Sequence, residues 1–422
     1  MPQSFAQLTT CLFSTLLLPS VCPAFAADGF ESHTVSKNAV LPGKQNDSVF
    51  VAPEQKQGID HRQRLRNLGV VIGSLPPGSN NAITDVDGVL VGHATLISGT
   101  GALKPGKGPV RTGVTAIIPH RGNFWNDRVT ANCFVLNGNG TMTGLDWVKE
   151  SGLLEGPILL TNTLSVGTVY DAAITWMIKK HPQIGIQDDT YLPVVGECDD
   201  STLNDIQGRH VKEEQVLAAL DNARGGAVQE GSVGAGTGMM GFAFKGGIGS
   251  SSRVVKEGDH SFTVGVLVNC NCGDRADLQI AGIPVGRLLL DYHPAAHKDG
   301  SIIIVVATDA PLNSLELERL AKRAALGLAR TGAIAHNGSG DIIFAFSTTR
   351  RAARNQKAII NNLPEINIEH IDPLFQASVE ATEESVLNAL CMADTMVGRD
   401  DNTAPGLPIG ECLEILHKHG MP

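Results

Sequence analysis

A glycine followed directly by a serine, at the start of an apolar run, is the segment of this sequence with the clearest chemical potential. Gly300 and Ser301 come after the polar residues 297–299, and the apolar run occupies residues 302–308. Glycine has no Cβ, so the hydroxyl of the next residue can approach the glycine carbonyl and attack it in an N-to-O acyl shift. Hydrolysis of that ester leaves Ser301 as the first residue of a new chain.

A free α-amine on Ser301 would supply the base that such a nucleophile needs. Its unperturbed pKa is about 7.7 to 8.0, so the neutral amine can accept the hydroxyl proton near neutral pH without a histidine. The same dipeptide more often serves as a plain turn that enters a strand. Gly249 and Ser250 follow another glycine turn, and residue chemistry alone does not separate Ser250 from Ser301.

Other sets of catalytic or ligand-binding side chains are incomplete. The 13 histidines form no metal-ligand pair of known spacing, so His93, His120 and His336 are interpreted as structural or surface residues. Residues 101–108 resemble a phosphate-binding loop but lack the Ser or Thr that should follow the lysine, which favours a surface loop. The glycine run at 234–238 predicts a tight turn. No metal or organic cofactor is implied.

Short β-rich runs and helical patterns follow one another in mixed order from residue 68 onward. Such an order, without strict strand-helix alternation, favours an α+β fold with helices outside and sheets inside. The runs at 261–268 and 302–308 are too apolar for solvent-exposed edge strands. We predict strands at 88–93, 112–118, 261–268, 302–308 and 341–347, and helices at 167–180, 212–224, 312–329 and 379–396.

The composition indicates a glycine-rich globular protein with an acidic surface. The 422 residues include 47 glycines and are 42% hydrophobic but 5% aromatic, which indicates many tight turns around an aliphatic core. The formal net charge is −10 and no cluster of basic residues offsets it, so nucleic acid is not expected as a partner.

The N-terminal region predicts export. Residues 1–26 contain no Asp, Glu, Lys or Arg, carry a mostly apolar stretch at 12–21 and end in Ala-Phe-Ala, the pattern of a signal-peptidase site. The stretch is too short to span a bilayer, so we expect cleavage after Ala26, with a retained anchor as the alternative. The mature protein is then periplasmic or secreted, without membrane attachment. Residues 27–60 are polar and aperiodic, which predicts a flexible leader before a domain at 61–422.

Six of the eight cysteines lie beyond the predicted signal peptide. In an oxidising compartment they allow fifteen pairings, and the sequence does not choose among them. Cys270 and Cys272 are too close together for a zinc knuckle, and no histidine follows at ligand spacing, so both are interpreted as strand residues.

Five ordered segments together resemble the markers of one enzyme family. They lie at 81–89, 193–197, 236–239, 245–249 and 300–311 and include Pro-Val-Val-Gly-Glu, Gly-Thr-Gly-Met and Lys-Gly-Gly-Ile-Gly. The chain is thereby similar to the DmpA and BapA family of serine aminopeptidases, which comprises L-aminopeptidase D-amidase/D-esterases and β-aminopeptidases. The likeness covers well over three quarters of the chain. It implies a four-layer αββα sandwich of the N-terminal-nucleophile-hydrolase type.

The resemblance also implies an internal cut. Family members mature into an α chain and a β chain that begins with the nucleophilic serine. The corresponding α chain here ends at Gly300 and the β chain begins at Ser301, which argues against Ser250. A serine and an acidic residue further along the β chain orient the nucleophile and its amine in the family, and the matching residues are Ser339 and Asp341.

Two further roles follow from the resemblance. The family stabilises the oxyanion with an asparagine amide, for which Asn269 is the preferred match and Asn271 the alternative. Glu197 matches the carboxylate that holds the free amine of the substrate. Relatives can carry an aromatic hydroxyl two residues after this glutamate, whereas this chain has Cys198 and Asp199. Backbone amides of the glycine run described above could then contribute to the oxyanion hole instead.

We therefore expect a self-processing aminopeptidase that works through an acyl-enzyme on Ser301. Its substrate would be a small peptide, amino-acid amide or ester with an L-, D- or β-amino acid first, and the resemblance suggests a homotetramer of the αβ pair. One alternative is an ornithine-acetyltransferase-like acyl transferase, although those enzymes use a threonine nucleophile. The other is a periplasmic solute-binding protein that never cleaves itself.

Overall fold

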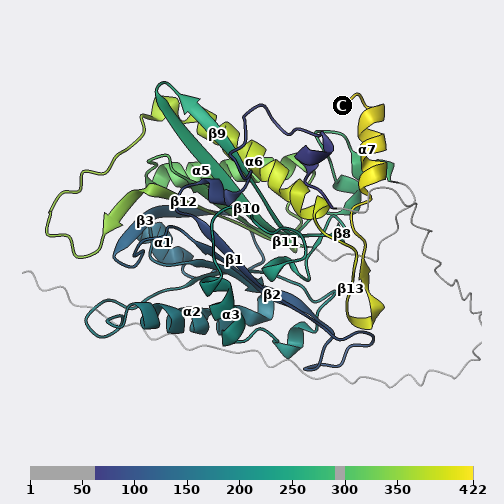
Figure 1. The fold of residues 1–422 in the computed structure, drawn as a ribbon, viewed down its shortest axis with the longest axis horizontal. Coiled ribbons are helices and arrows are strands. Elements are labelled where there is room, and N and C mark those ends of the chain that lie inside the picture. Colours follow the sequence, from purple (N-terminus) through teal and green to yellow (C-terminus); the bar gives the residue numbers. More distant parts are fainter. Residues whose placement is uncertain (1–61, 290–299, 422) are drawn as a thin grey trace, which may run out of the picture. The chain divides into compact units, whose positions relative to one another are not determined.

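Two β-sheets lie at the centre of the computed structural model, which describes residues 62–289 and 300–421 (Figure 1). The predicted signal peptide at 1–26 and the leader at 27–60 lie outside these residues. The first sheet has four strands in the order β1-β2-β5-β6, and the second has six in the order β4-β3-β12-β11-β10-β9. Neighbouring strands are antiparallel, except for the parallel pairs β5/β6 and β11/β12.

The strands and α-helices are short to medium in length. The strands are β1 Leu90–Ser98, β2 Val110–Ile118, β3 Asp127–Gly138, β4 Leu153–Leu154, β5 Ile158–Asn162, β6 Val194–Cys198, β7 Met240–Gly241, β8 Phe244–Lys245, β9 Gly247–Glu257, β10 His260–Asn271, β11 Ser301–Thr308, β12 Gly340–Ala353, β13 Met396–Val397 and β14 Thr403–Ala404. The helices are α1 Leu145–Ser151, α2 Val166–Lys180, α3 Glu213–Asp221, α4 Val285–Leu288, α5 Ser314–Arg330, α6 Asp372–Cys391 and α7 Ile409–Lys418.

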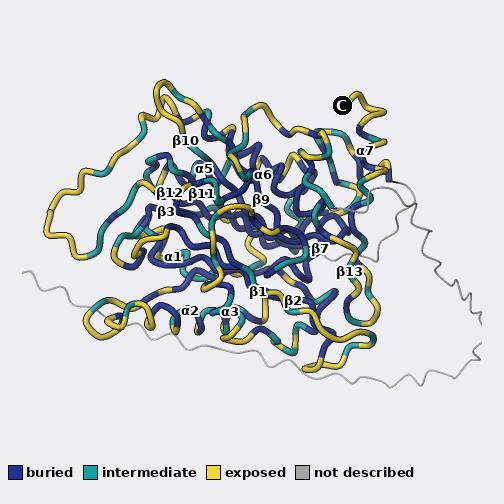
Figure 2. Tube along the Cα trace, in the orientation of Figure 1, coloured by how far each residue is buried: buried dark blue, intermediate teal, exposed yellow. Residues whose placement is uncertain are grey.

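Three hydrophobic cores define four layers. Alternate residues of a strand point to opposite faces of its sheet, so Ile303 and Val305 of β11 join the core between the two sheets. Ile302 and Ile304 face the opposite side and pack with residues of α5 and α6. A third core lies between the four-stranded sheet and the helices α2 and α3. The order of layers is therefore helix, sheet, sheet, helix, and Figure 2 shows the buried residues concentrated in the sheets. The expected αββα sandwich is confirmed.

The parallel strand pairs position the candidate site. Helix α5 connects β11 to β12, and parallel neighbours begin at the same edge of a sheet. Ser301 at the start of β11 therefore lies beside Gly340 and Asp341 at the start of β12. On the other side of β11, Ser301 is paired with Asn271 at the end of β10.

Each strand and helix predicted from the sequence overlaps an observed element, one helix was misplaced, and other elements, among them β3, β9 and α7, were not predicted. The helix expected at 379–396 is α6, which runs from Asp372 to Cys391, and Met396 belongs to β13. Almost every residue of α6 is buried, including Glu380 and Glu384, which form ion pairs with the buried Arg253. A helix buried on all sides has no polar face to mark its limits. No helix among the described residues is long and apolar enough to cross a membrane.

Candidate active site

Ser301 is the first residue of β11 and faces the space between the two sheets. Its side chain belongs to the same strand face as Ile303, and the residue is 8% exposed. The backbone N–H of Gly340 donates a hydrogen bond to Ser301 Oγ at 3.0 Å. This contact holds the hydroxyl oxygen and leaves its proton available to a base.

Ser339 and Asp341 lie beside this serine as a hydrogen-bonded pair. Ser339 Oγ donates to Asp341 Oδ2 at 2.6 Å, a short distance typical of a hydroxyl bound to a carboxylate. The amide of Asn137 donates to Ser339 Oγ at 3.1 Å and to the carbonyl of His336 at 2.7 Å. Both residues of the pair are nearly inaccessible to solvent. The structure therefore brings Ser301, Ser339 and Asp341 together.

Burial sets the electrostatics of Asp341. Loss of solvent raises the pKa of this carboxyl group, while the hydrogen bonds from Ser339 and the backbone of Ile302 oppose the rise. A cation next to Asp341 would favour its charged form. The N-terminal ammonium of a newly formed β chain would be such a cation, because it would belong to the residue before Ile302.

Asn269 has an unusual environment for a polar residue. It lies on β10 two residues before Asn271, and both asparagines share the strand face of Ser301. The side chain is fully buried, yet neither Nδ2 nor Oδ1 has a hydrogen-bond partner among the residues that the structure describes. An unpaired buried amide is costly, so this group is available to a ligand.

The amide of Asn271 is already used. Its Oδ1 accepts a hydrogen bond from the backbone of Met240 at 2.7 Å, and its Nδ2 donates to the carbonyl of Asp199 at 3.0 Å. Asp199 itself is exposed and its carboxylate accepts from the backbone of Ser201. Asp199 therefore offers no hydroxyl donor in place of the aromatic one that relatives can carry.

The glycine run also has few free donors. The N–H groups of Gly234 and Ala235 donate to the hydroxyls of Thr95 and Thr115, and that of Gly236 donates to the carbonyl of Val233. These amides are engaged within the fold, which leaves Asn269 as the better-placed candidate for an oxyanion donor.

Glu197 lies at the end of β6, on the sheet that faces Ser301. Its Oε1 accepts from the backbone of Thr141 at 2.7 Å, and its Oε2 accepts from the hydroxyl of Thr163. The residue is 4% exposed, and burial raises the pKa of its carboxyl group. Next to it, Cys198 Sγ donates to the carbonyl of Asn269 at 3.6 Å, which connects the ends of β6 and β10. A substrate ammonium beside Glu197 would form a charge-assisted hydrogen bond with the carboxylate and so compensate for the water that burial removes.

The other candidates from the sequence have structural environments. Ser250 lies within β9, fully buried, and its hydroxyl donates to the carbonyl of Val266. Burial lowers the pKa of His93 to about 4, so its ring is neutral and bonds to a threonine hydroxyl. His120 bonds to a backbone carbonyl. Residues 101–108 form a mostly exposed turn whose last residue, Gly108, is buried.

The described cysteines and the metal-ligand candidates have structural environments, and two of them, Cys198 and His336, lie beside the candidate site. The six cysteines beyond the predicted signal are buried free thiols, and the Sγ atoms of Cys270 and Cys272 are 4.0 Å apart. Asp274, Asp277 and His336 place one ligand atom each within 4.8 Å of one another, and are the one such cluster among the described residues. This cluster is partly exposed, and His336 Nε2 lies 3.4 Å from Asp274 Oδ2 and 3.9 Å from Asp277 Oδ2.

Sequence reasoning missed three residues that hold the site together. Asn137 binds Ser339, and Thr141 and Thr163 bind Glu197. Asn137 lies at the end of β3 and Thr141 follows the strand, both in the run Asn-Gly-Asn-Gly-Thr at 137–141. The two glycines of this run indicate that backbones approach closely there, and they were the feature of the sequence that could have pointed to these residues.

The comparisons with known proteins identify the family of the chain. A model of Peptidase family S58 matches residues 81–404. The chain belongs to this family. It is 46% identical over 372 residues to the β-peptidyl aminopeptidase BapA of Sphingosinicella microcystinivorans, which covers 84% of this chain and 92% of that protein.

Solved structures of S58-like enzymes have the same fold. A β-aminopeptidase from Burkholderia sp. superposes with a TM-score of 0.79 at 42% identity, covering 85% of this chain and all of that one. The L-aminopeptidase D-Ala-esterase/amidase of Ochrobactrum anthropi gives a TM-score of 0.79 at 41% identity, covering 85% and 99%. It is described as a prototype of the serine aminopeptidases and a variant of the N-terminal-nucleophile hydrolase fold. This chain is therefore an aminopeptidase of the S58 family, which argues against acyl transfer and solute binding.

Proposed function

We propose that the protein is a self-processing aminopeptidase whose nucleophile is Ser301 and whose general base is the α-amine of the same residue. The observation that carries the proposal is the group of buried polar side chains around the start of β11. Ser301, the pair Ser339–Asp341 and the unpaired amide of Asn269 occur at one edge of the inter-sheet space.

Maturation begins with an intact bond between Gly300 and Ser301. Ser301 Oγ attacks the carbonyl carbon of Gly300, the C–N bond breaks, and an ester joins the two residues. Water then hydrolyses the ester, which leaves a carboxylate on Gly300 and a free amine on Ser301. Asp341 stabilises the ammonium form of that amine, and Ser339 orients the carboxylate.

Peptide hydrolysis uses the same hydroxyl. The neutral α-amine takes the proton of Ser301 Oγ as the oxygen attacks the first carbonyl of the substrate, and Asn269 Nδ2 donates to the oxyanion. The resulting ammonium returns a proton to the leaving amine. Water, activated by the α-amine, then releases the acyl group and regenerates the hydroxyl.

Glu197 provides the exopeptidase specificity in this proposal. Its carboxylate binds the free ammonium of the substrate. A substrate whose first amine is acylated or joined to a preceding residue has no such ammonium and is therefore excluded. Substrates with an N-terminal L-amino acid and with an N-terminal β-amino acid are both proposed, because relatives at 41% to 46% identity are named for each activity.

Two further features are part of the proposal. Residues 1–26 act as a signal peptide removed after Ala26, and the mature protein is exported. The processed αβ pairs assemble into a homotetramer. N-terminal sequencing of the exported form tests the cleavage after Ala26, and sedimentation of the purified protein tests the tetramer.

Steady-state kinetics of leucine p-nitroanilide and its N-acetyl derivative test the role of Glu197. We expect the acetylated compound to be hydrolysed at least about 100-fold more slowly than the free amine. Glu197→Gln should raise KM for the free amine by about 10- to 100-fold, the usual loss for a hydrogen bond between charged groups, with a smaller effect on kcat. Asp199→Asn is the matched control, since Asp199 is an exposed carboxylate two residues away.

The pH dependence gives a second readout. Glu197 binds an ammonium only as a carboxylate, and burial raises its pKa, so kcat/KM falls when the pH drops through that raised value. The Gln variant should lose the part of the acid limb that Glu197 contributes, while the fall caused by protonation of the Ser301 α-amine remains. Equal hydrolysis of free and acetylated substrates, or an equal effect of Asp199→Asn, would contradict the assignment.

A further inference from the structure

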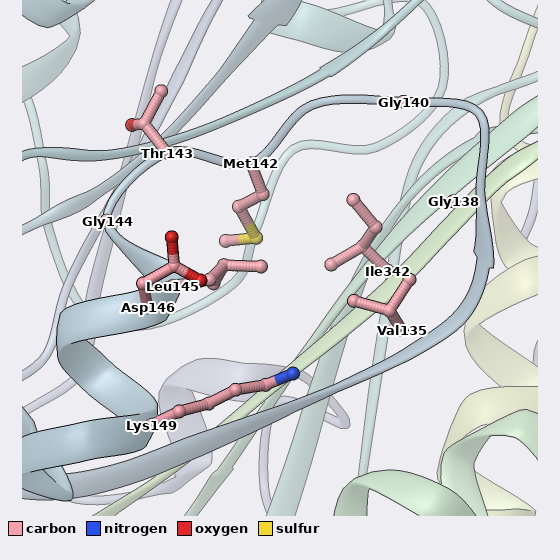
Figure 3. A pocket seen from close by; sticks show the side chains of 10 residues that line it. All are labelled: Val135, Gly138, Gly140, Met142, Thr143, Gly144, Leu145, Asp146, Lys149 and Ile342. Carbon is pink, nitrogen blue, oxygen red and sulfur yellow. The ribbon is translucent and has the colours of Figure 1, made fainter. Parts of the chain in front are cut away.

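A cavity of about 360 Å³ lies beside the candidate active site (Figure 3). Binding pockets for small ligands usually have volumes of about 300 to 1,000 Å³, so this one is large enough for a substrate group. Its residues come from β3, β12, α1 and the segment between β3 and α1. They are Val135, Gly138, Gly140, Met142, Thr143, Gly144, Leu145, Asp146, Lys149 and Ile342.

Gly140 is shared by the cavity and the candidate site. A Cβ atom placed on Gly140 would lie 3.1 Å from the Cα of Gly340 and 3.4 Å from Glu197 Oε1. Gly340 is the residue whose N–H binds Ser301 Oγ. The cavity therefore begins within one residue of both the nucleophile and the proposed amine-binding carboxylate.

The sheet geometry makes the cavity an extension of the same inter-sheet space. On the six-stranded sheet, Gly340 pairs with Gly138 and Ile342 with Val135. The cavity floor therefore lies two residues further along β12 and three residues back along β3, where a β-bulge adds one residue. On the other side, Met142 bridges to Gly196, the residue before Glu197. The segment that carries Met142 thus continues the four-stranded sheet beyond β6 and covers the cavity.

We propose that this cavity receives the side chain of the N-terminal residue of the substrate and favours apolar side chains. The inference rests on the proposed function, because the amine at Glu197 and the carbonyl at Ser301 fix where that side chain begins. The neighbouring space is the cavity, and its walls include the apolar side chains of Met142, Leu145 and Ile342.

The charged residues of the cavity belong to helix α1. Figure 3 shows Lys149 extending from α1 toward Val135 and Ile342, and Asp146 one helical turn away. Both residues are exposed to solvent. The charges of Lys149 and Asp146 cancel, so the cavity has no net charge that would attract an ionic side chain of the substrate. Burial of apolar groups then dominates, and each additional buried methylene should raise kcat/KM about fourfold.

The test compares two adjacent residues of β3. Val135 and Leu136 are 37% and 40% exposed, and a β-bulge leaves Leu136 without a partner in the register between β3 and β12. Of the two residues, Val135 lines the cavity. Val135→Phe fills the cavity at a position where the fold tolerates bulk, and Leu136→Phe is the matched control. The substrates are the p-nitroanilides of glycine, alanine, leucine, phenylalanine and glutamate.

The wild type should show kcat/KM rising from glycine to leucine. Val135→Phe should lower kcat/KM for leucine and phenylalanine at least about tenfold while glycine and alanine stay within about twofold, and Leu136→Phe should leave all ratios unchanged. The same loss for every substrate, no change in Val135→Phe, or a preference for glutamate that Lys149→Met removes would overturn the inference. Failure of the wild type to hydrolyse any of the five would instead overturn the proposed function, and this inference with it.

Discussion

The unpaired amide of Asn269 links residue-scale energetics to catalysis. A buried donor or acceptor without a partner typically costs about 1 to 3 kcal/mol, and Asn269 buries one of each. The neighbouring Asn271 makes two hydrogen bonds and incurs no such cost. The proposed oxyanion supplies the missing acceptor for Asn269 during the reaction. The cost in the resting enzyme is the expected counterpart of a preorganised site.

Asn269→Ala should separate catalysis from stability. We expect kcat for leucine p-nitroanilide to fall about 100- to 1,000-fold, as for loss of one oxyanion donor, with KM changing much less. The free energy of unfolding in urea should stay equal or increase, because the variant removes an unpaired polar group. Processing of the variant is followed on a denaturing gel, since the same amide can serve the cleavage step.

Asn271→Ala is the control at the same strand end. This variant leaves the backbone N–H of Met240 unpaired, so the free energy of unfolding should drop by about 1 to 3 kcal/mol. Its kcat should fall much less than that of Asn269→Ala. The reverse pattern, with Asn271 essential for kcat and Asn269 for stability, would assign the oxyanion role to Asn271.

The difference between Ser301 and Ser250 shows the limit of residue-level prediction. Both serines follow a glycine and both enter β-strands. Ser301 begins its strand beside the start of β12, whereas Ser250 lies within β9 and bonds to Val266. That distinction depends on which strands are neighbours, which a single sequence without the family resemblance does not contain. The resemblance, by contrast, predicts Ser301, Asp341 and Asn269 as site residues, and the fold places these three at neighbouring strand ends.

At the scale of elements, the turn at 236–239 depends on one buried lysine. Lys245 Nζ donates to the carbonyls of Gly236, Met239 and Gly246 at 2.8 to 3.0 Å. Burial lowers the pKa of Lys245 to about 7, while the three acceptors match the three donors of the ammonium form. The turn leads into Met240, whose N–H binds Asn271, so Lys245 supports the strand end that carries both asparagines.

Lys245→Met should destabilise the fold strongly. It removes three hydrogen bonds of a buried ammonium, although the carbonyls of Gly236 and Met239 keep a backbone donor each, so we expect the free energy of unfolding to fall by roughly 3 kcal/mol. Urea denaturation measures this loss. Lys256→Met, which changes an exposed lysine on β9, should stay within about 0.5 kcal/mol of the wild type. Equal stability of the two variants would contradict the role given to Lys245.

Element prediction succeeded where strands are uniformly apolar and failed where burial is complete on a helix. β11 was predicted at 302–308 and observed as Ser301–Thr308, because a run of aliphatic residues after a glycine has few alternatives. The start of α6 at Asp372 was missed, since the helix is buried on nearly all sides and has no polar face to mark its limits. Its buried Glu384 pairs with Arg66 and Arg253, which are distant in sequence and come close only in the fold.

At the scale of the whole molecule, the two products of the proposed cut are interleaved. In the six-stranded sheet, β11 and β12 lie between β10 and β3, so strands from after the cut are flanked on both sides by strands from before it. Buried ion pairs also cross the cut, including those of Arg253 with Glu380 and Glu384. The processed chains should therefore remain together under native conditions and separate when denatured.

Intact-mass analysis of purified wild type and Ser301→Ala tests the central claim most directly. Under denaturing conditions the wild type should give the masses of two fragments, one that ends at Gly300 and one that begins at Ser301. The variant should give the mass of one uncut chain. Under native conditions both should be single species of equal composition. A wild-type chain that stays uncut yet releases leucine from leucine p-nitroanilide would contradict the account, because Ser301 would then have no free α-amine to act as the base.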